Sequence, residues 1–437
     1  MRMATVQGKI IRNLFRQGLL SLGISLCLGG CQKGEEVLPE EEIISPTTGS
    51  RKEFTLDSIF LYARQVYLWQ DGLPGYADFN PRSRYGQFTP ELTAYKTELY
   101  DISQMNINPQ TGTPYESPVY AGNPKYSFME ETSHTITDRL VLVVGGSTDA
   151  ILKASVLDVG NKTLAYLALG SFPELSSCQD ELDQAFSTFA QAEASAIAID
   201  LRSNGGGYVK TAEYVANLLI PSRLNGKVMY TEVFNEQMQD GKATILQHQL
   251  YRDALGNTVE YQGRLATLAD VDFSMAANTS YFHKKGALEA IQDVYFIVSG
   301  NTASASELLI SSLKPYVNVK LVGEKTFGKP VGFFNILIDT YSFYFSNFII
   351  QNADGWSDYL NGMEPDVSIA LPANATLGDP EEPGLKGVVS LLKKEQVTVI
   401  DVMAERQIRK HQNNRMKKKT TSYIPIYKQH FRLKQSL

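Results

Sequence analysis

Three short segments of the sequence combine residue types that could carry out nucleophilic chemistry. They are a glycine-rich loop at 200–207, a serine-rich turn at 300–308 and a lysine-bearing segment at 325–330. A serine hydroxyl is a weak nucleophile until an adjacent base removes its proton, and a neutral lysine amine is one such base. The three segments could therefore supply a serine nucleophile and a lysine base.

The serine turn follows a predicted strand at 294–299 and leads into a predicted helix that runs through Leu313. A turn of small residues at a helix N-terminus exposes a hydroxyl, and the next amide and the helix dipole favour developing negative charge. The same residues also fit a plain serine N-cap, with Glu307 completing a capping box. Taken alone, this segment favours the plain cap.

The glycine-rich loop reads Asp-Leu-Arg-Ser-Asn-Gly-Gly-Gly over residues 200–207. Consecutive glycines let backbone N–H groups approach a ligand, because no side chain stands in the way. Such a loop could hold a phosphate group or the oxyanion of an acyl-transfer intermediate. It could equally be a tight turn after a strand, since glycine turns are common there.

Lys329 can act as a base only when its amine is neutral. The pKa of lysine must then fall by several units from about 10.4, which requires burial in apolar surroundings. Phe327, Pro330, Val331 and Phe333 are suitable apolar neighbours. An exposed Lys329 is disfavoured beside so apolar a stretch.

Histidine and cysteine offer no competing chemistry. The five histidines are scattered and form no metal motif, so a Ser-His pair would depend on unseen proximity to His283. The three cysteines, Cys27, Cys31 and Cys178, allow no disulfide framework and no cysteine-based metal site. We expect Cys178 to be a packing residue at a helix start.

Alternating strands and helices begin near residue 156 and must position these segments. The predicted strands are 163–172, 195–200, 227–234, 293–299 and 319–324, and the predicted helices lie around 182–190 and 209–220. Strand–helix alternation indicates an α/β layer structure. Before it, apolar residues between Leu56 and Tyr67 recur at helical spacing and predict a buried helix face.

The three motifs, in this order, resemble the C-terminal processing (tail-specific) serine peptidase family, in its bacterial envelope lipoprotein branch. Lys329 follows Ser304 by 25 residues, which is the family's spacing, and the resemblance covers about residues 156–372. It implies a crotonase/ClpP-like α/β fold of layered β-sheet and helices, with a small helical N-terminal segment. It also implies hydrolysis of protein or peptide substrates, with no cofactor and no metal.

The resemblance assigns a role to each matching residue. Ser304 matches the nucleophile and Lys329 the general base, while the backbone N–H groups of Gly206 and Ala305 match the oxyanion donors. Two further residues match supporting positions, Glu307 and Asn204.

The sequence departs from the family where a peptide-binding PDZ domain usually lies. Only residues 128–155, a connector, separate the helical N-terminal segment (54–127) from the catalytic domain (156–372). An independent domain needs about 50 residues or more. The PDZ domain is therefore predicted to be missing or reduced to a remnant, which leaves substrate recruitment open.

The first 30 residues resemble a lipoprotein signal peptide, with basic residues followed by a short apolar stretch that ends in Leu-Gly-Gly-Cys31. The alternative is an ordinary signal peptide with an accidental cysteine. With lipid on Cys31, residues 31–53 are an acidic tether, and the protein is anchored in the cell envelope, at the periplasmic or surface face of the outer membrane. The sequence specifies no oligomeric state.

The remaining chain comprises a predicted C-terminal helix (373–400) and a basic tail (401–437). Residues 406–437 hold ten Lys or Arg and no Asp or Glu. The tail could contact anionic lipid or polysaccharide, or could simply be a solvated end. The net charge of −6 argues against nucleic-acid binding. Two functions remain, an active serine endopeptidase and a catalytically silent relative that binds peptides or another ligand.

Overall fold

The computed structural model describes residues 45–132, 149–253, 256–394, 426–427 and 431–434. Its contacts divide the chain into residues 1–42 and 43–437, and all described residues belong to the second unit. The predicted signal peptide, Cys31 and most of the acidic tether therefore lie outside the described residues. Within the described ranges, no helix is both long and apolar enough to cross a membrane.

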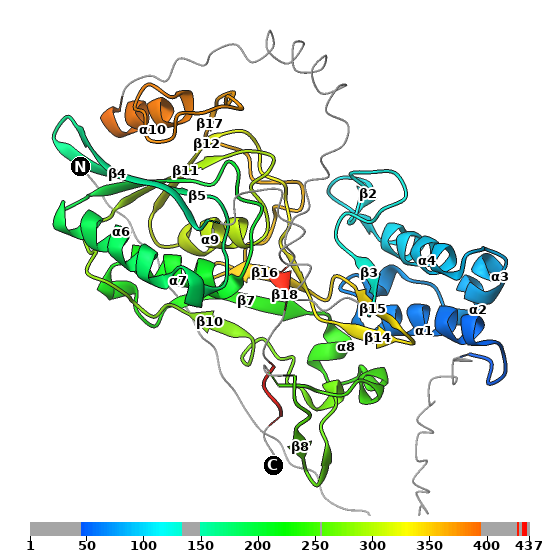
Figure 1. Ribbon diagram of the computed structural model, residues 1–437. Coiled ribbons are helices and arrows are strands. Elements are labelled where there is room, and N and C mark those ends of the chain that lie inside the picture. The colour runs from blue at the N-terminus through cyan, green and yellow to red at the C-terminus, as the bar shows by residue number, and fades with distance from the viewer. Residues whose placement is uncertain (1–44, 133–148, 254–255, 395–425, 428–430, 435–437) are drawn as a thin grey trace, which may run out of the picture. The chain divides into compact units, whose positions relative to one another are not determined.

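A six-stranded sheet forms the centre of the α/β part (Figure 1). Its strand order is β17-β12-β11-β6-β5-β4, and only β4 runs antiparallel to its neighbour. In chain order the strands are β4 (Ile151–Val159), β5 (Lys162–Leu169), β6 (Ala196–Asp200), β11 (Asp293–Val298), β12 (Asn318–Gly323) and β17 (Val367–Ser368).

Both faces of this sheet are covered by helices, and the strands are correspondingly apolar on both sides. On one face Ala196 and Ala198 pack with helix α10 (Pro383–Lys393). On the other face Ile197 and Ile199 join the larger core. Helices α6 (Gln179–Gln191), α7 (Val209–Leu219) and α9 (Ala305–Leu313) contribute to that larger core, together with the N-terminal helices.

A second sheet of five strands lies against α9 and has the order β10-β7-β16-β13-β18. Its members are β7 (Val228–Phe234), β10 (Thr279–Tyr281), β13 (Val331–Phe333), β16 (Phe348–Asn352) and β18 (Ile426–Tyr427). β13 begins two residues after Lys329, so this sheet receives the chain directly from the lysine segment. Its edge strand, β18, belongs to the predicted basic tail and pairs in parallel with β13.

The N-terminal segment is helical, and a small sheet joins it to the rest. Its helices are α1 (Arg51–Val66), α2 (Tyr76–Phe79), α3 (Pro81–Tyr85) and α4 (Glu91–Met105). The small sheet has the order β14-β15-β3, built from β3 (Phe128–Glu131), β14 (Ile336–Ile338) and β15 (Tyr341–Tyr344). Because β3 pairs with β15, the end of the N-terminal segment lies beside a strand that follows the lysine segment in the sequence.

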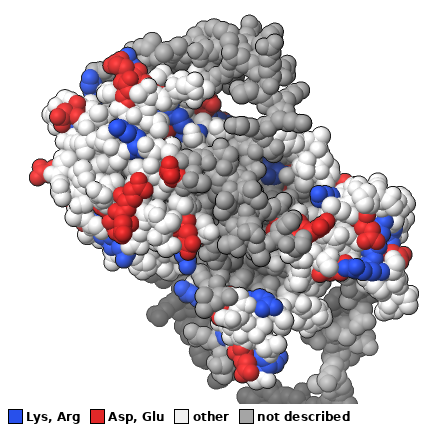
Figure 2. Space-filling view, in the orientation of Figure 1, with Lys and Arg blue, Asp and Glu red and all other residues white. Residues whose placement is uncertain are grey.

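Short elements complete the description: α8 (Glu236–Gln239), β1 (Ile107–Asn108), β2 (Thr113–Pro114), β8 (Glu260–Tyr261) and β9 (Arg264–Leu265). The space-filling view shows acidic and basic side chains interspersed over the face it presents (Figure 2).

The predicted fold class, an α/β arrangement of layered sheet and helices after a helical N-terminal segment, is confirmed. Some boundaries differ. α1 begins at Arg51, inside the predicted tether, because Ser50 and Glu53 form a capping box that starts the helix earlier. β4 begins at Ile151, inside the predicted connector, because it pairs with β5 as an edge strand. Within the predicted C-terminal helix (373–400), the structure has the shorter α10 (Pro383–Lys393), and residues 395–400 lie outside the described part.

Candidate active site

Ser304 lies at the turn between the end of β11 and the start of α9, where it is the N-cap residue. Its backbone has φ 60° and ψ −120°, a conformation that residues with a Cβ rarely adopt. Such strain persists only where surrounding contacts impose it, and it recurs at sharp strand-to-helix turns that carry a nucleophile. Ser304 is fully buried in this structure.

The glycine-rich loop lies directly against Ser304. A Cβ placed on Gly206 would lie 2.9 Å from the Cβ of Ser304 and 3.2 Å from its Oγ. The backbone φ of Gly206 is 109° and that of Gly207 is 141°, and both values favour glycine. A side chain on Gly207 would also collide with the carbonyl of Phe172. Glycine is therefore required here both for backbone conformation and for close approach to the serine.

The two predicted oxyanion donors differ in their hydrogen bonding. The N–H of Gly206 donates to Oδ1 of Asn204 at 2.9 Å, so it already has an internal acceptor. Ala305 is the first residue of α9, a position where the backbone N–H has no acceptor within the helix. Nδ2 of Asn204 is buried and has no hydrogen-bond partner within the described structure. An oxyanion that binds the N–H of Gly206 would have to share this donor with Oδ1 of Asn204 or replace that oxygen as the acceptor.

Glu307 joins the serine turn to the lysine segment. Its Oε2 accepts the N–H of Ser304 at 3.1 Å and the N–H of Lys329 at 2.8 Å. Its Oε1 accepts the N–H of Gly328 at 2.7 Å and the hydroxyl of Thr326 at 2.5 Å. Burial raises the pKa of Glu307, while these four donors act in the opposite direction. One buried carboxylate therefore fixes the backbone of both candidate catalytic residues.

Lys329 is buried, with 5% of its surface exposed. Burial lowers the pKa of its amine to about 8, against the raising influence of Glu116 and Glu307. Its Nζ lies over the ring of Phe333, 5.1 Å from the centroid. These observations agree with the sequence-based expectation that Lys329 needs apolar burial to become a base.

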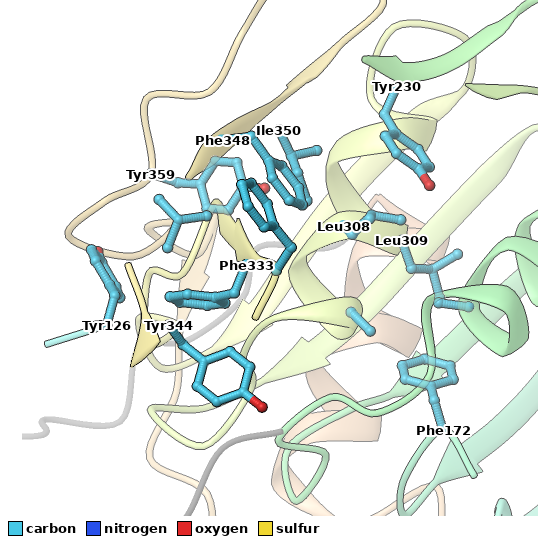
Figure 3. Close-up of a cluster of buried hydrophobic side chains, with 14 of the residues drawn as sticks. Tyr126, Phe172, Tyr230, Leu308, Leu309, Phe333, Tyr344, Phe348, Ile350 and Tyr359 are labelled. Carbon is cyan, nitrogen blue, oxygen red and sulfur yellow. The ribbon is translucent and has the colours of Figure 1, made fainter. Parts of the chain in front are cut away.

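The apolar surroundings of Lys329 belong to a cluster of aromatic side chains. Figure 3 shows Phe333, Tyr344, Phe348 and Tyr359 gathered together, with Leu308 of α9 beside them. All five are buried. Of these side chains, Phe333 contacts the amine of Lys329, and burial is the largest cause of the lowered pKa of that amine.

Hydroxyl groups of the serine turn bind the backbone of the glycine-rich loop. Oγ of Ser299 donates to the carbonyl of Arg202 at 2.6 Å, and Oγ1 of Thr302 donates to that of Leu201 at 2.8 Å. Oγ of Ser306 donates to the carbonyl of Asn204 at 3.1 Å. These contacts were not predicted from the sequence, although Ser and Thr side chains often bind nearby backbone groups in turns.

The glycine-rich loop is also tied to α10 through a buried ion-pair network that the sequence analysis missed. Nε of Arg202 binds both carboxylate oxygens of Asp200, at 2.9 and 3.0 Å, and its two terminal nitrogens bind Glu382. Glu382 is the N-cap residue of α10. The loop is thereby held from the face of the sheet opposite α9.

The competing residues do not gather around Ser304. His283 is exposed at the end of β10, and its backbone N–H binds Asn217. Cys178 is buried at the start of α6, where burial raises the pKa of its thiol to about 11. In the described part of the chain, no cluster of three or more His, Cys, Asp or Glu could hold a metal ion.

The segment that contains the candidate catalytic residues matches a known protein family. Residues 163–369 match the model of peptidase family S41. The chain is similar to a structure named as an S41 protease from Bacteroides fragilis, with 19% identity and a TM-score of 0.41, over 56% of this chain and 58% of that one. The chain thus spans less than two thirds of that relative.

Two other solved structures are similar over more of their length. A photosystem II D1 C-terminal processing protease has 14% identity and a TM-score of 0.46, over 77% of this chain and 100% of that one. A lipoprotein from Streptococcus agalactiae has 14% identity and a TM-score of 0.44, over 80% and 99%. The matched segment contains the glycine-rich loop, the serine turn and the lysine segment.

Proposed function

We propose that the chain is a serine endopeptidase that hydrolyses protein or peptide substrates through a Ser304–Lys329 dyad. One observation supports this proposal most strongly. A single carboxylate oxygen, Oε2 of Glu307, accepts hydrogen bonds from the backbone N–H groups of both residues. The lowered pKa of the buried Lys329, about 8, supplies the second requirement, a lysine that loses its proton near neutral pH.

In the proposed reaction, neutral Nζ of Lys329 takes the proton of Ser304 as Oγ attacks the carbonyl carbon of the scissile peptide bond. The tetrahedral intermediate collapses, the C–N bond breaks, and Lys329 returns the proton to the leaving amine. Lys329 then takes a proton from water as the water oxygen attacks the acyl carbon. The bond between that carbon and Oγ of Ser304 breaks, the carboxyl product leaves, and Lys329 returns the proton to Oγ. No step requires a metal or a cofactor.

The oxyanion of the intermediate is assigned to the N–H groups of Ala305 and Gly206. Ala305 suits this role because its N–H is at the start of α9, where the helix dipole favours negative charge. Gly206 can contribute when the substrate oxygen replaces Oδ1 of Asn204 as the acceptor. Asn204 then acts as a supporting residue that satisfies this N–H before substrate binds.

The proposal is tested by incubating the purified protein and two variants with an unstructured polypeptide. Ser304→Ala should abolish cleavage because it removes the nucleophile. Lys329→Arg should also abolish it, although the positive charge is kept, because arginine does not become a neutral base. Equal cleavage by native and Ser304→Ala protein would sink the proposal. Near-normal turnover by Lys329→Arg would rule out the dyad.

One observation favours the second candidate, a catalytically silent protein that binds peptides or another ligand with the same cleft. The N–H of Gly206 is engaged by Asn204, so half of the assigned oxyanion site is occupied by the protein itself. A silent protein would bind an unstructured peptide with the same affinity before and after Ser304→Ala, without releasing products. Release of products by the native protein but not by Ser304→Ala would favour the peptidase.

We further propose that lipid on Cys31 anchors the protein in the cell envelope after removal of residues 1–30, with the outer membrane as the site. The proposed domains are those stated from the sequence, with the catalytic part at 156–372 and no complete PDZ domain before it. Cys31→Ser should abolish incorporation of radiolabelled palmitate and release the protein from membranes. Unchanged labelling would contradict the anchor without affecting the dyad.

A further inference from the structure

The loop that carries Lys329 is bound by a residue outside the segment matched to peptidase family S41. The hydroxyl of Tyr126 donates to the carbonyl of Gly328 at 2.7 Å and reaches the carbonyl of Leu360 at 2.9 Å. Tyr126 is buried, with 3% of its surface exposed. Gly328 is the residue directly before Lys329 and has a φ of 85°, so its peptide orientation sets where the lysine side chain projects.

The preceding residue binds the same loop. Nζ of Lys125 donates to the carbonyl of Phe327 at 3.2 Å and to the carbonyl of Leu360 at 2.5 Å. It also lies over the ring of Phe327, 5.0 Å from the centroid. Its amine is thus committed to backbone carbonyls next to Lys329, in a half-buried position.

Tyr126 and the next residue, Ser127, are themselves held by Glu116. This fully buried carboxylate accepts the N–H of Tyr126 at 3.0 Å, and both the N–H and the hydroxyl of Ser127, at 2.7 and 2.6 Å. It also accepts the hydroxyl of Ser346 at 2.9 Å, on the chain between β15 and β16. The contacts fix the backbone of residues 126–127 against the domain that contains the lysine.

Building on the proposed function, we propose that Tyr126 and Lys125 are positioning residues for Lys329. Tyr126 fixes the Gly328 carbonyl and hence the direction of the lysine side chain. Lys125 brings a second amino group against the same loop, where it opposes protonation of Lys329 by like-charge repulsion. Neither residue touches the substrate in this scheme.

The charged groups that face Lys329 come from three places. Glu116 and Glu307 favour its protonated form, and Lys125 disfavours it, with burial as the largest cause of the lowered pKa. Burial also lowers the pKa of Lys125 to about 8, and Glu307, Glu116 and Lys325 act on it as well. Removing the charge of Lys125 should therefore raise the pKa of Lys329, so that a higher pH is needed to obtain the neutral base.

The role of Tyr126 is tested with Tyr126→Phe, which removes the hydroxyl and keeps the ring. We expect kcat on an unstructured polypeptide to fall about tenfold with KM unchanged, a loss of one hydrogen bond that positions a reacting group. The matched control is Tyr85→Phe, since Tyr85 is equally buried and its hydroxyl binds Asp101 in the N-terminal segment, away from the lysine loop. Equal kcat losses in both variants would overturn the proposal for Tyr126.

The role of Lys125 is tested by measuring how fast a fluorophosphonate probe labels Ser304 at different pH values. Lys125→Met should move the midpoint of this profile to higher pH, and Lys125→Arg should leave it at or below the native value because arginine stays protonated throughout. Lys284→Met is the control. Lys284 also donates its Nζ to backbone carbonyls, of Lys285 and Leu288, but on the chain after β10.

The outcomes separate this inference from the proposed function. If native protein is labelled and Ser304→Ala is not, the serine is a nucleophile. An unchanged midpoint in Lys125→Met would then overturn the proposal for Lys125 alone. If the native protein shows neither labelling nor cleavage, the proposed function fails, and the positioning roles fail with it.

Discussion

The serine turn and the lysine loop are held in different ways. The turn (299–308) is fixed by hydrogen bonds to the glycine-rich loop and by Glu307, all within the segment matched to peptidase family S41. The lysine loop (325–330) shares Glu307, but Lys125 and Tyr126 also bind it from outside that segment. The proposed nucleophile is positioned locally, whereas the proposed base depends on distant parts of the chain.

This difference has a functional consequence. A turn held by its own motif keeps its geometry as long as the central sheet is folded. A loop held by the N-terminal segment can lose its geometry when that segment shifts, while the sheet remains intact. Substitutions should therefore separate the two regions, except at Glu307, which belongs to both.

Glu307→Gln should have the largest effect, because it disturbs both regions together. The amide offers one acceptor oxygen where the carboxylate accepts four donors, and its NH2 group opposes a backbone N–H. We expect the free energy of unfolding to fall by about 2–5 kcal/mol, measured by urea denaturation.

Glu364→Gln is the matched control for this change. The side chain of Glu364 is 72% exposed and, among described salt bridges, pairs only with Lys325, whose side chain is 45% exposed. Its loss should cost about 1 kcal/mol or less. If the two variants unfold at the same urea concentration, Glu307 does not join the two regions as described.

Gly206→Ala should damage the serine side alone. A Cβ there would lie 2.9 Å from the Cβ of Ser304, and alanine is strained at a φ of 109°. We expect kcat to fall by about 10²–10³, the cost of losing one oxyanion donor. Gly355→Ala is the control, because its φ is 75° but no atom lies within 4 Å of the added Cβ. Similar kcat values for the two variants would show that the close approach to Ser304 is dispensable.

The sequence predicts the serine side better than the lysine side, for a physical reason. The Asp200–Gly207 loop and the 300–308 turn each follow a strand, and parallel strands bring their carboxyl ends to one sheet edge. The Gly206–Asn204 bond is also local, since an Asn side chain often accepts a backbone N–H two residues later.

The supports of the lysine are not predictable in this way. Tyr126 contacts Gly328 across more than 200 positions of sequence. No periodicity or spacing connects the two, since the contact arises only when β3 pairs with β15. The sequence did indicate that Lys329 must be buried, because Phe333 and its neighbours are apolar. Which residues would bury it, and that Glu116 and Lys125 would face it, depended on the tertiary fold.

Thr326→Val should have a smaller effect, on the lysine side alone. The hydroxyl of Thr326 donates to Glu307 and accepts the N–H of Met363 at 2.7 Å, so valine leaves both groups without a partner. We expect a loss of about 1–3 kcal/mol in unfolding free energy. Thr188→Val is the control, since its exposed hydroxyl binds only the carbonyl of Gln184 among described contacts. Equal stability of the two variants would contradict a structural role for this hydroxyl.

The pH dependence of activity tests the lysine side without any substitution. Activity requires neutral Lys329, whose pKa is lowered to about 8, so kcat/KM should fall about tenfold for each pH unit below this value. Stability behaves differently. Because the folded pKa lies below the unfolded value of about 10.4, the unfolded state binds more protons between these limits, and Lys329 makes stability rise with pH over that window. Lys329→Met should reduce this rise. Activity that stays constant from pH 8 to pH 6 would show that a neutral lysine is not the base. The contacts of the N-terminal segment with the lysine loop would then have no role in positioning a base.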